Sequence, residues 1–376
     1  MIRVSKSCLS NIEKRYLKKV IDKQYLGMGP EVMKFEQSLE KFFNRKVICV
    51  NSGTAALHLA LQAYNVKPGD EVLVPAITYV ATYQAISATG AKPVLCDIRD
   101  DNLCISEKSI LKNITKKTKV IIPVHFAGHP CELKNIYKIA KQNNLKVIED
   151  SAHAFGSYYK KKLLGSFGQI SCFSFDGIKN ITSGEGGCVV LNDYRTYKKI
   201  CDARLLGVSG DSKKRYTNQR SWKFNVIDQG WRYHMSDVNA AIGRGQLKRF
   251  KKLAQKRKSL SLAYNNFFSE HQKKIKVFKR DFKSEVPHIY CVLIKGLKKR
   301  DSLRTDLLKE KIQTGIHYIP GYKLDYYKDN KKNFPICEKV HSQLLTLPLH
   351  PDLKISHISF IGNKLIKLLK NKKYFY

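Results

Sequence analysis

Short apolar runs alternate with amphipathic stretches along the first part of the chain. Residues 54–64, TAALHLALQAY, carry Ala and Leu at helical spacing, which predicts a helix. VICVNSG at residues 47–53 is typical of a strand entering a turn, and KPGDEVLVP at residues 67–75 of a turn followed by a strand. Strands that alternate with helices predict an α/β fold whose mostly parallel sheet is covered by helices on both faces.

Three further apolar runs, KPVLCDI, KVIIPVHF and KVIED, have the length of buried strands and end in polar residues. A helix is predicted at residues 131–144, CELKNIYKIAKQNN, before the last of them. In such a sheet the functional groups gather beyond the carboxyl ends of the strands. The polar residues that follow these runs are therefore candidates for a site.

The pattern changes near the middle of the chain. A long charged helix is predicted at residues 246–268, and a strand at HIYCVLIKG. Two further helices are predicted at residues 301–313 and 355–370. We therefore expect a large domain over residues 1–245 and a smaller α+β domain over residues 246–376. Because no flexible linker separates them, the domains are expected to pack together, and the N-terminal segment could pack on the small domain.

Composition restricts the class of protein. The chain has 376 residues, a length typical of two domains, and its ten cysteines include no C-x-x-C pair. Unpaired cysteines of this kind fit a reducing compartment better than a disulfide scaffold or a zinc site, so no metal is expected. The chain shows no apolar run of membrane-spanning length and no secretory signal, so we expect a cytoplasmic protein without a membrane span.

The chain is strongly basic, with 69 Lys and Arg against 31 Asp and Glu and a net charge of +38. Such a charge raises the possibility of nucleic-acid binding. The lysines, however, occur in pairs and short runs along the whole chain, without a basic tail or an RNA-binding signature. We interpret the charge as a lysine-rich composition that attracts anionic substrates, and we expect no nucleic-acid partner.

Two segments suggest a phosphate site and a reactive amine. NSGTAAL, with Gly53 and Thr54, forms a small-residue turn at a helix N-terminus, which suits a phosphate; the alternative is an ordinary capped helix with Thr54 near the N-cap. In SFDGIKNITSGEGG, Ser174 can offer a hydroxyl to a phosphate, and Lys179 precedes a glycine-rich turn. A poorly hydrated Lys179 would favour its neutral, nucleophilic amine; the alternative is a surface lysine.

Two more segments suggest a site for a flat ring. In VIEDSAHAFGS, Asp150 ends a strand and could pair with a protonated ring nitrogen, or it could cap a helix. His153 could cover a cofactor face or only pack. Tyr79 in ITYVATYQA could stack on a ring or belong to the core. A phosphate cradle, a stacking aromatic, a carboxylate and an enclosed lysine together make up a pyridoxal-phosphate site.

The order of these segments resembles that in the DegT/StrS-like sugar-nucleotide aminotransferases, pyridoxal-phosphate enzymes of fold type I. The likeness covers nearly the whole chain, through SGTAALHLAL, PGDEVLVPAITYVAT, VIEDSAHAFGS, CFSFDGIKNITSGEGG and LLTLPLHP. It implies Lys179 as the Schiff-base lysine and Asp150 on the pyridine nitrogen. The further cofactor contacts that it implies are Tyr79 and His153 at the ring and Gly53, Thr54 and Ser174 at the phosphate. Relatives with His in place of the lysine are dehydratases, and Lys179 argues against that activity.

One block departs from the family. GWRYHMSDVNAAIG stands where relatives carry G-Y-N-Y-R-M, so Arg232 replaces an Asn that reaches the phosphate in the neighbouring subunit. His234 replaces an Arg that lies near substrate. Arg232 could still bind the phosphate, or both could be altered surface or interface residues. We expect His234, His317 and Tyr318 at the substrate, and the family implies a homodimer with shared active sites.

The resemblance implies the substrate class. The expected reaction turns a nucleotide-linked 4-keto-6-deoxy sugar into the 4-amino sugar, with L-glutamate as amino donor, for a surface polysaccharide or lipopolysaccharide. Amination of a 3-keto sugar is the nearest alternative. A catalytically silent regulator or binding protein derived from the family is another, although Lys179 and Asp150 weigh against it.

Overall fold

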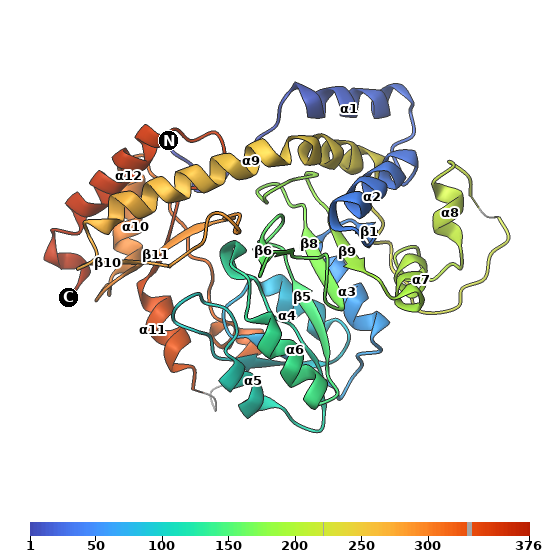
Figure 1. Ribbon diagram of the computed structural model, residues 1–376, viewed down its shortest axis with the longest axis horizontal. Helices are drawn as coiled ribbons and strands as arrows, with labels where there is room; N and C mark the ends of the chain where they lie inside the picture. The colour runs from blue at the N-terminus through green and yellow to red at the C-terminus, as the bar shows by residue number, and fades with distance from the viewer. Residues whose placement is uncertain (221, 329–332) are drawn as a thin grey trace.

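The computed structural model describes residues 1–220, 222–328 and 333–376 (Figure 1). A seven-stranded sheet with the order β1-β9-β8-β5-β4-β2-β3 forms its centre. Only the two pairings made by β9 are antiparallel, which confirms the predicted mostly parallel sheet. The strands are β1 (Lys46–Val50), β2 (Glu71–Pro75), β3 (Lys92–Cys96), β4 (Thr118–Ile121), β5 (Lys146–Asp150), β8 (Ile170–Ser174) and β9 (Gly187–Leu191).

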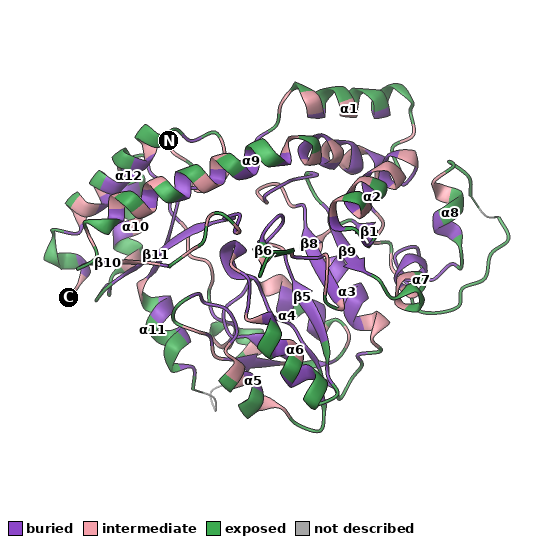
Figure 2. Ribbon diagram, viewed as in Figure 1, coloured by how far each residue is buried: buried purple, intermediate pink, exposed green. Residues whose placement is uncertain are grey.

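Helices cover both faces of this sheet, as predicted. Alternate residues of β1 belong to two separate cores: Ile48 and Val50 pack with α3, and Val47 and Cys49 pack with α2. The strands are buried, and most of the helices expose their outer sides, whereas α3 has no exposed residue (Figure 2). The helices around the sheet are α2 (Pro30–Phe43), α3 (Gly53–Ala63), α4 (Val80–Ser87), α5 (Glu107–Asn113), α6 (Leu133–Gln142) and α7 (Tyr194–Ala203).

The C-terminal part of the chain builds a second, smaller core. Three antiparallel strands in the order β10-β11-β12 pack against helices from the same part of the chain. Their apolar residues form a core separate from that of the large sheet. The elements are β10 (Ile275–Val277), β11 (Tyr290–Ile294), β12 (Leu344–Leu347), α10 (Arg300–Lys309) and α12 (Ile355–Leu368).

Helix α9 (Asp237–Ser269) runs along both parts of the molecule (Figure 1). The predicted start at residue 246 is wrong, because Ser236 caps a helix that already begins at Asp237. Gly243 and Gly245, which resemble a helix break, lie inside the helix. A Cβ at Gly243 would come within 2.6 Å of the Phe35 ring, so the glycine serves close packing. The boundary expected between residues 245 and 246 therefore falls within a continuous helix.

The N-terminal segment contacts the C-terminal part before the chain enters α1 (Asn11–Asp22). The Ile2 amide donates to the Lys311 carbonyl at 2.7 Å, and the Leu349 amide donates to the Val4 carbonyl at 3.0 Å. α1 then packs along α9 (Figure 1). Within the described ranges, we find no helix with the length and apolar character that crossing a membrane requires.

Candidate active site

A cavity of about 390 Å³ lies at the carboxyl ends of β5 and β8. Residues from six separate parts of the chain line it, as the shared edge of parallel strands predicts. All but two of the residues predicted for the site are among them: Gly53, Thr54, Tyr79, Asp150, His153, Ser174, Lys179, His317 and Tyr318.

Lys179 lies in the loop between β8 and β9. Its backbone amide donates to the Asp176 carbonyl at 3.1 Å, and the Ser183 amide donates to Phe175 at 2.8 Å, so the loop doubles back on itself. Gly184 allows this turn with a φ of +82°. Burial lowers the pKa of Lys179 to about 8, although the carboxylates of Asp150 and Asp176 oppose the shift. About a tenth of the amine is therefore neutral and nucleophilic at pH 7, far more than for an exposed lysine.

Asp150 ends β5 and is 5% exposed. Its Oδ2 accepts a hydrogen bond from the Thr82 hydroxyl at 2.8 Å, and its Oδ1 accepts one from the Ala152 amide at 3.1 Å. Burial raises the pKa of Asp150, while both hydrogen bonds and the charge of Lys179 oppose the rise. The alternative of a helix cap is wrong, because no helix begins between β5 and β6 (Tyr158–Tyr159), all of whose residues the structure describes.

The first turn of α3 and the end of β8 form a narrow polar cradle. Ser52, and not Thr54, is the N-cap of α3, since its side chain accepts from the Ala55 amide at 3.0 Å. A Cβ at Gly53 would lie 2.8 Å from the Ser174 Cβ, so glycine keeps this approach open. Free backbone N–H groups at a helix N-terminus beside a hydroxyl suit a phosphate.

His153 and Tyr318 form a hydrogen-bonded pair. The Nδ1 of His153 accepts from the Ala127 amide at 3.2 Å, so its Nε2–H donates to the Tyr318 hydroxyl at 2.8 Å. Burial and the nearby Lys179 charge hold the pKa of His153 well below its usual value, so the ring is neutral. His317 is also neutral, because burial lowers its pKa to about 4, and its Nδ1 is 3.0 Å from the Thr346 hydroxyl.

Tyr79 stands at the mouth of the cavity. It is the N-cap residue of α4 and is 55% exposed, so the alternative of a core tyrosine is wrong. Its ring is tilted by 49° against the ring of Tyr318, with the centroids 5.5 Å apart. Tyr79 is therefore available to a flat ligand in the cavity.

Thr82 is a polar residue of the cavity, in contact with Asp150, that sequence reasoning missed. It lies one turn after Tyr79 on α4, and its buried hydroxyl also contacts that of Thr78 at 3.1 Å. The three-residue spacing from Tyr79 was the available signal, because it places both side chains on one side of the helix. Its role depends on the position of α4 relative to Asp150, which the sequence does not show.

Arg232 and His234 lie outside this cavity. They line a separate hollow of about 200 Å³ together with Arg215 and Phe224. Burial lowers the pKa of His234 to about 4, helped by the neighbouring Arg232 charge. Within one chain, therefore, the structure does not bring Arg232 or His234 to Lys179.

The residues of the cavity fit pyridoxal phosphate. Asp150 offers a carboxylate to a protonated ring nitrogen, Lys179 a poorly hydrated amine to an aldehyde, and the α3 N-terminus a phosphate cradle. The Gly53 position supports this fit, since a side chain there would fill the cradle.

Comparison with known proteins gives the same result. Residues 7–366 match the model of the DegT/DnrJ/EryC1/StrS aminotransferase family. The chain is similar to the uncharacterized protein MJ1066 of Methanocaldococcus jannaschii (36% identity, covering 97% of both chains). It is also similar to GDP-perosamine synthase of Escherichia coli O157:H7 (34% identity, covering 99% of both). The structure of the "putative sugar aminotransferase Spr1654" from Streptococcus pneumoniae, in its PMP form, superposes with a TM-score of 0.91 at 28% identity. The match covers 98% of this chain and 99% of that one. The chain therefore belongs to the DegT/DnrJ/EryC1/StrS aminotransferase family.

Proposed function

We propose that this protein transfers the amino group of L-glutamate to the C-4 keto group of a nucleotide-linked 6-deoxy sugar. As a member of its family, the chain is a sugar aminotransferase that uses pyridoxal phosphate. The observation that carries the transamination chemistry is the pair of Lys179 and Asp150 in one cavity, beside the N-terminus of α3. The relative named GDP-perosamine synthase supports a nucleotide-linked sugar as the acceptor.

When bound, pyridoxal phosphate links covalently to a lysine amine and serves as the electron sink of transamination. In this chain Asp150 would hold the proton on the ring nitrogen, and the hydrogen bond from Thr82 favours the ionised Asp150 carboxylate against the effect of burial. The α3 N-terminus and the Ser174 hydroxyl would hold the phosphate. The Lys179 amine would be placed to accept and return the proton at the carbon that gains or loses nitrogen.

The substrate side of the cavity is formed by neutral polar groups. His153 orients the Tyr318 hydroxyl, and His317 adds a neutral imidazole. A volume of about 390 Å³ is near the lower end of the range of ligand pockets, roughly 300–1,000 Å³. It admits a cofactor and a sugar ring, so the nucleotide would lie outside, where the net charge of +38 attracts its phosphates.

The hollow that contains Arg232 supports a homodimer with shared sites. Beside it the chain exposes a run of large apolar side chains, of which Trp222 is 89% exposed. Exposed apolar patches of this kind are typical of interfaces. We propose that this surface packs on a second copy and brings Arg232 to the partner's cofactor phosphate, with His234 near its substrate. The other exposed members of the run are Phe224, Val226 and Ile227.

A panel of nucleotide keto sugars tests the proposed reaction. The purified protein is incubated with pyridoxal phosphate, ¹⁵N-labelled L-glutamate and 4-keto-6-deoxy or 3-keto-6-deoxy sugars on GDP, UDP or dTDP. We expect ¹⁵N in the product of a 4-keto sugar only, by mass spectrometry, and none with Lys179→Ala. Labelled product from the 3-keto sugars alone would refute C-4 amination, and cofactor binding without amination of any sugar would support a silent relative.

A further inference from the structure

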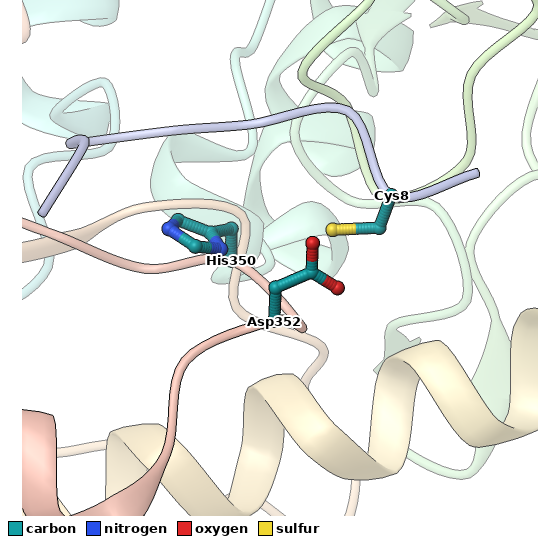
Figure 3. Close-up of side chains that lie close together, drawn as sticks. All are labelled: Cys8, His350 and Asp352. Atoms are coloured by element: carbon teal, nitrogen blue, oxygen red, sulfur yellow. The ribbon is translucent and has the colours of Figure 1, made fainter.

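Three side chains of types that commonly bind metals lie close together, away from the active site. Cys8 comes from the N-terminal segment, and His350 and Asp352 come from the loop after β12 (Figure 3). One potential ligand atom from each residue lies within 4.8 Å of the other two. Cys8 is 7% exposed and His350 is 5% exposed, whereas Asp352 faces solvent. None of the three lines the cavity that contains Lys179.

The buried imidazole of this cluster has a free nitrogen. His350 Nδ1 is shielded from solvent and has no hydrogen-bond partner among the residues that the structure describes. A ring nitrogen of His350 faces the side on which the Asp352 carboxylate and the Cys8 sulfur lie (Figure 3). Leaving such a group unpaired in the interior is costly, so a buried polar atom of this kind indicates a missing partner.

The carboxylate of the cluster already holds a cation. Lys6 Nζ lies 2.6 Å from Asp352 Oδ2, and both side chains are about half exposed. An exposed ion pair of this kind contributes little to stability, so the Lys6 side chain can move into solvent. A metal ion can then replace the ammonium at the same carboxylate.

We propose that Cys8, His350 and Asp352 bind a divalent transition-metal ion of the zinc type. Zinc accepts thiolate, imidazole and carboxylate ligands together, whereas magnesium and calcium prefer oxygen ligands alone. Three protein ligands leave a fourth position for water. Burial raises the pKa of the Cys8 thiol to about 11, so the metal must displace the thiol proton when it binds. The resulting thiolate and the Asp352 carboxylate would then balance the charge of the metal.

The surroundings give the ion a route of entry. Cys8 and Asp352 also line an open hollow of about 740 Å³ over α9. The sequence predicted no metal because it contains no C-x-x-C pair, but these ligands lie near opposite ends of the chain. Only the fold brings them together.

A metal at this position would connect the N-terminal segment to the active-site loop. The hydroxyl of Ser7, next to Cys8, donates to the Gly177 carbonyl at 2.5 Å, two residues before Lys179. Coordination of Cys8 would therefore restrain the segment that contacts the lysine loop. Hydrogen exchange of residues 2–10 should slow when the metal binds.

Zinc binding to the untagged holoenzyme tests the site. After removal of metal with a chelator, the protein is titrated with ZnCl₂ in a calorimeter, and we expect one ion per chain. Cys8→Ser and His350→Asn should each weaken binding by more than about 100-fold, since even an outer-shell change costs about 10- to 100-fold. Lys6→Met should tighten it by removing the competing ammonium. His357→Asn, a nearby histidine outside the cluster, is the matched control and should bind like wild type.

X-ray absorption at the zinc edge decides the ligands without a variant. We expect one sulfur at about 2.3 Å and nitrogen or oxygen neighbours at about 2.0–2.2 Å. A zinc spectrum without sulfur, or equal affinities of Cys8→Ser and wild type, would overturn the proposal. Because the readouts do not involve transamination, their failure would leave the proposed reaction untouched.

Discussion

Replacing Thr82 with valine removes one hydroxyl and leaves a side chain of nearly the same size. In the native protein this hydroxyl donates to Asp150 Oδ2 at 2.8 Å and favours the ionised carboxylate. Without it the pKa of Asp150, already raised by burial, rises further. Bound pyridoxal phosphate with a protonated ring nitrogen needs the ionised form, so Thr82→Val should weaken cofactor binding.

The size of the effect depends on pH. A hydrogen bond to a charged group contributes about 1.5–3 kcal/mol, which corresponds to roughly 10- to 100-fold in affinity. At low pH the cofactor-free carboxyl is protonated and must ionise on binding, so the full loss is seen. At high pH the Asp150 carboxylate is ionised both with and without cofactor. The substitution then costs the cofactor-free and the cofactor-bound protein the same hydrogen bond, so the affinity does not change. The ratio of variant to wild-type Kd should therefore be largest at acidic pH and approach one at alkaline pH.

Titration of the cofactor-free proteins with pyridoxal phosphate across pH, followed by absorbance, measures this ratio. Ser87→Ala is the matched control, since Ser87 lies on the same helix but contacts the Tyr327 hydroxyl instead of Asp150. Thr78→Val, which removes the contact to the Thr82 hydroxyl, should give a smaller effect in the same direction. A ratio that stays at one, or that does not change with pH, would refute the role of Thr82.

Three further predictions concern the other residues of the site. Asp150→Asn should keep its circular dichroism spectrum but slow transamination by about 10²-fold or more, and near-wild-type turnover would contradict its electrostatic role. Lys179→Met should stabilise the cofactor-free protein at pH 7 by at most about 3 kcal/mol in urea unfolding, because the pKa of Lys179 falls from 10.5 to about 8 on folding. Between about pH 8 and pH 10.5 the native state has lost the Lys179 proton, whereas the unfolded chain keeps it, so the free energy of unfolding of the wild type should rise with pH through this range. A stability difference between variant and wild type that stays constant with pH would contradict this. Co-expressed Lys179→Ala and Arg232→Ala chains should regain activity through the one site that keeps both residues, and no gain over either parent would contradict shared sites.

The sheet could be predicted from the sequence because its strands depend on local patterns. The apolar runs before Gly53, Pro75 and Asp150 are short, Val-rich and bounded by turns, and each forms a strand at the predicted place. The start of α9 could not be predicted in the same way. From propensity alone, Gly243 and Gly245 predict a break in the helix. The close approach of Gly243 to the Phe35 ring, which the sequence does not show, explains why a glycine lies inside the helix instead.

The candidate site could be predicted in part for the same reason. Lys179 and Asp150 follow strand ends, and parallel strands bring their ends to one edge, so side chains distant in sequence meet there. Thr82 depends on how α4 is rotated against β5, which no local pattern records. The role that we propose for Arg232 depends on a second copy of the chain, so neither the sequence nor one subunit shows it.

We propose that the Lys179 amine carries the cofactor. Reduction of the holoenzyme with sodium borohydride makes the covalent link permanent, and peptide mapping by mass spectrometry then locates the adduct. We predict that the adduct lies on the peptide that contains Lys179, and that Lys179→Ala loses both the adduct and turnover. An adduct on any other lysine of the wild-type protein would contradict the account.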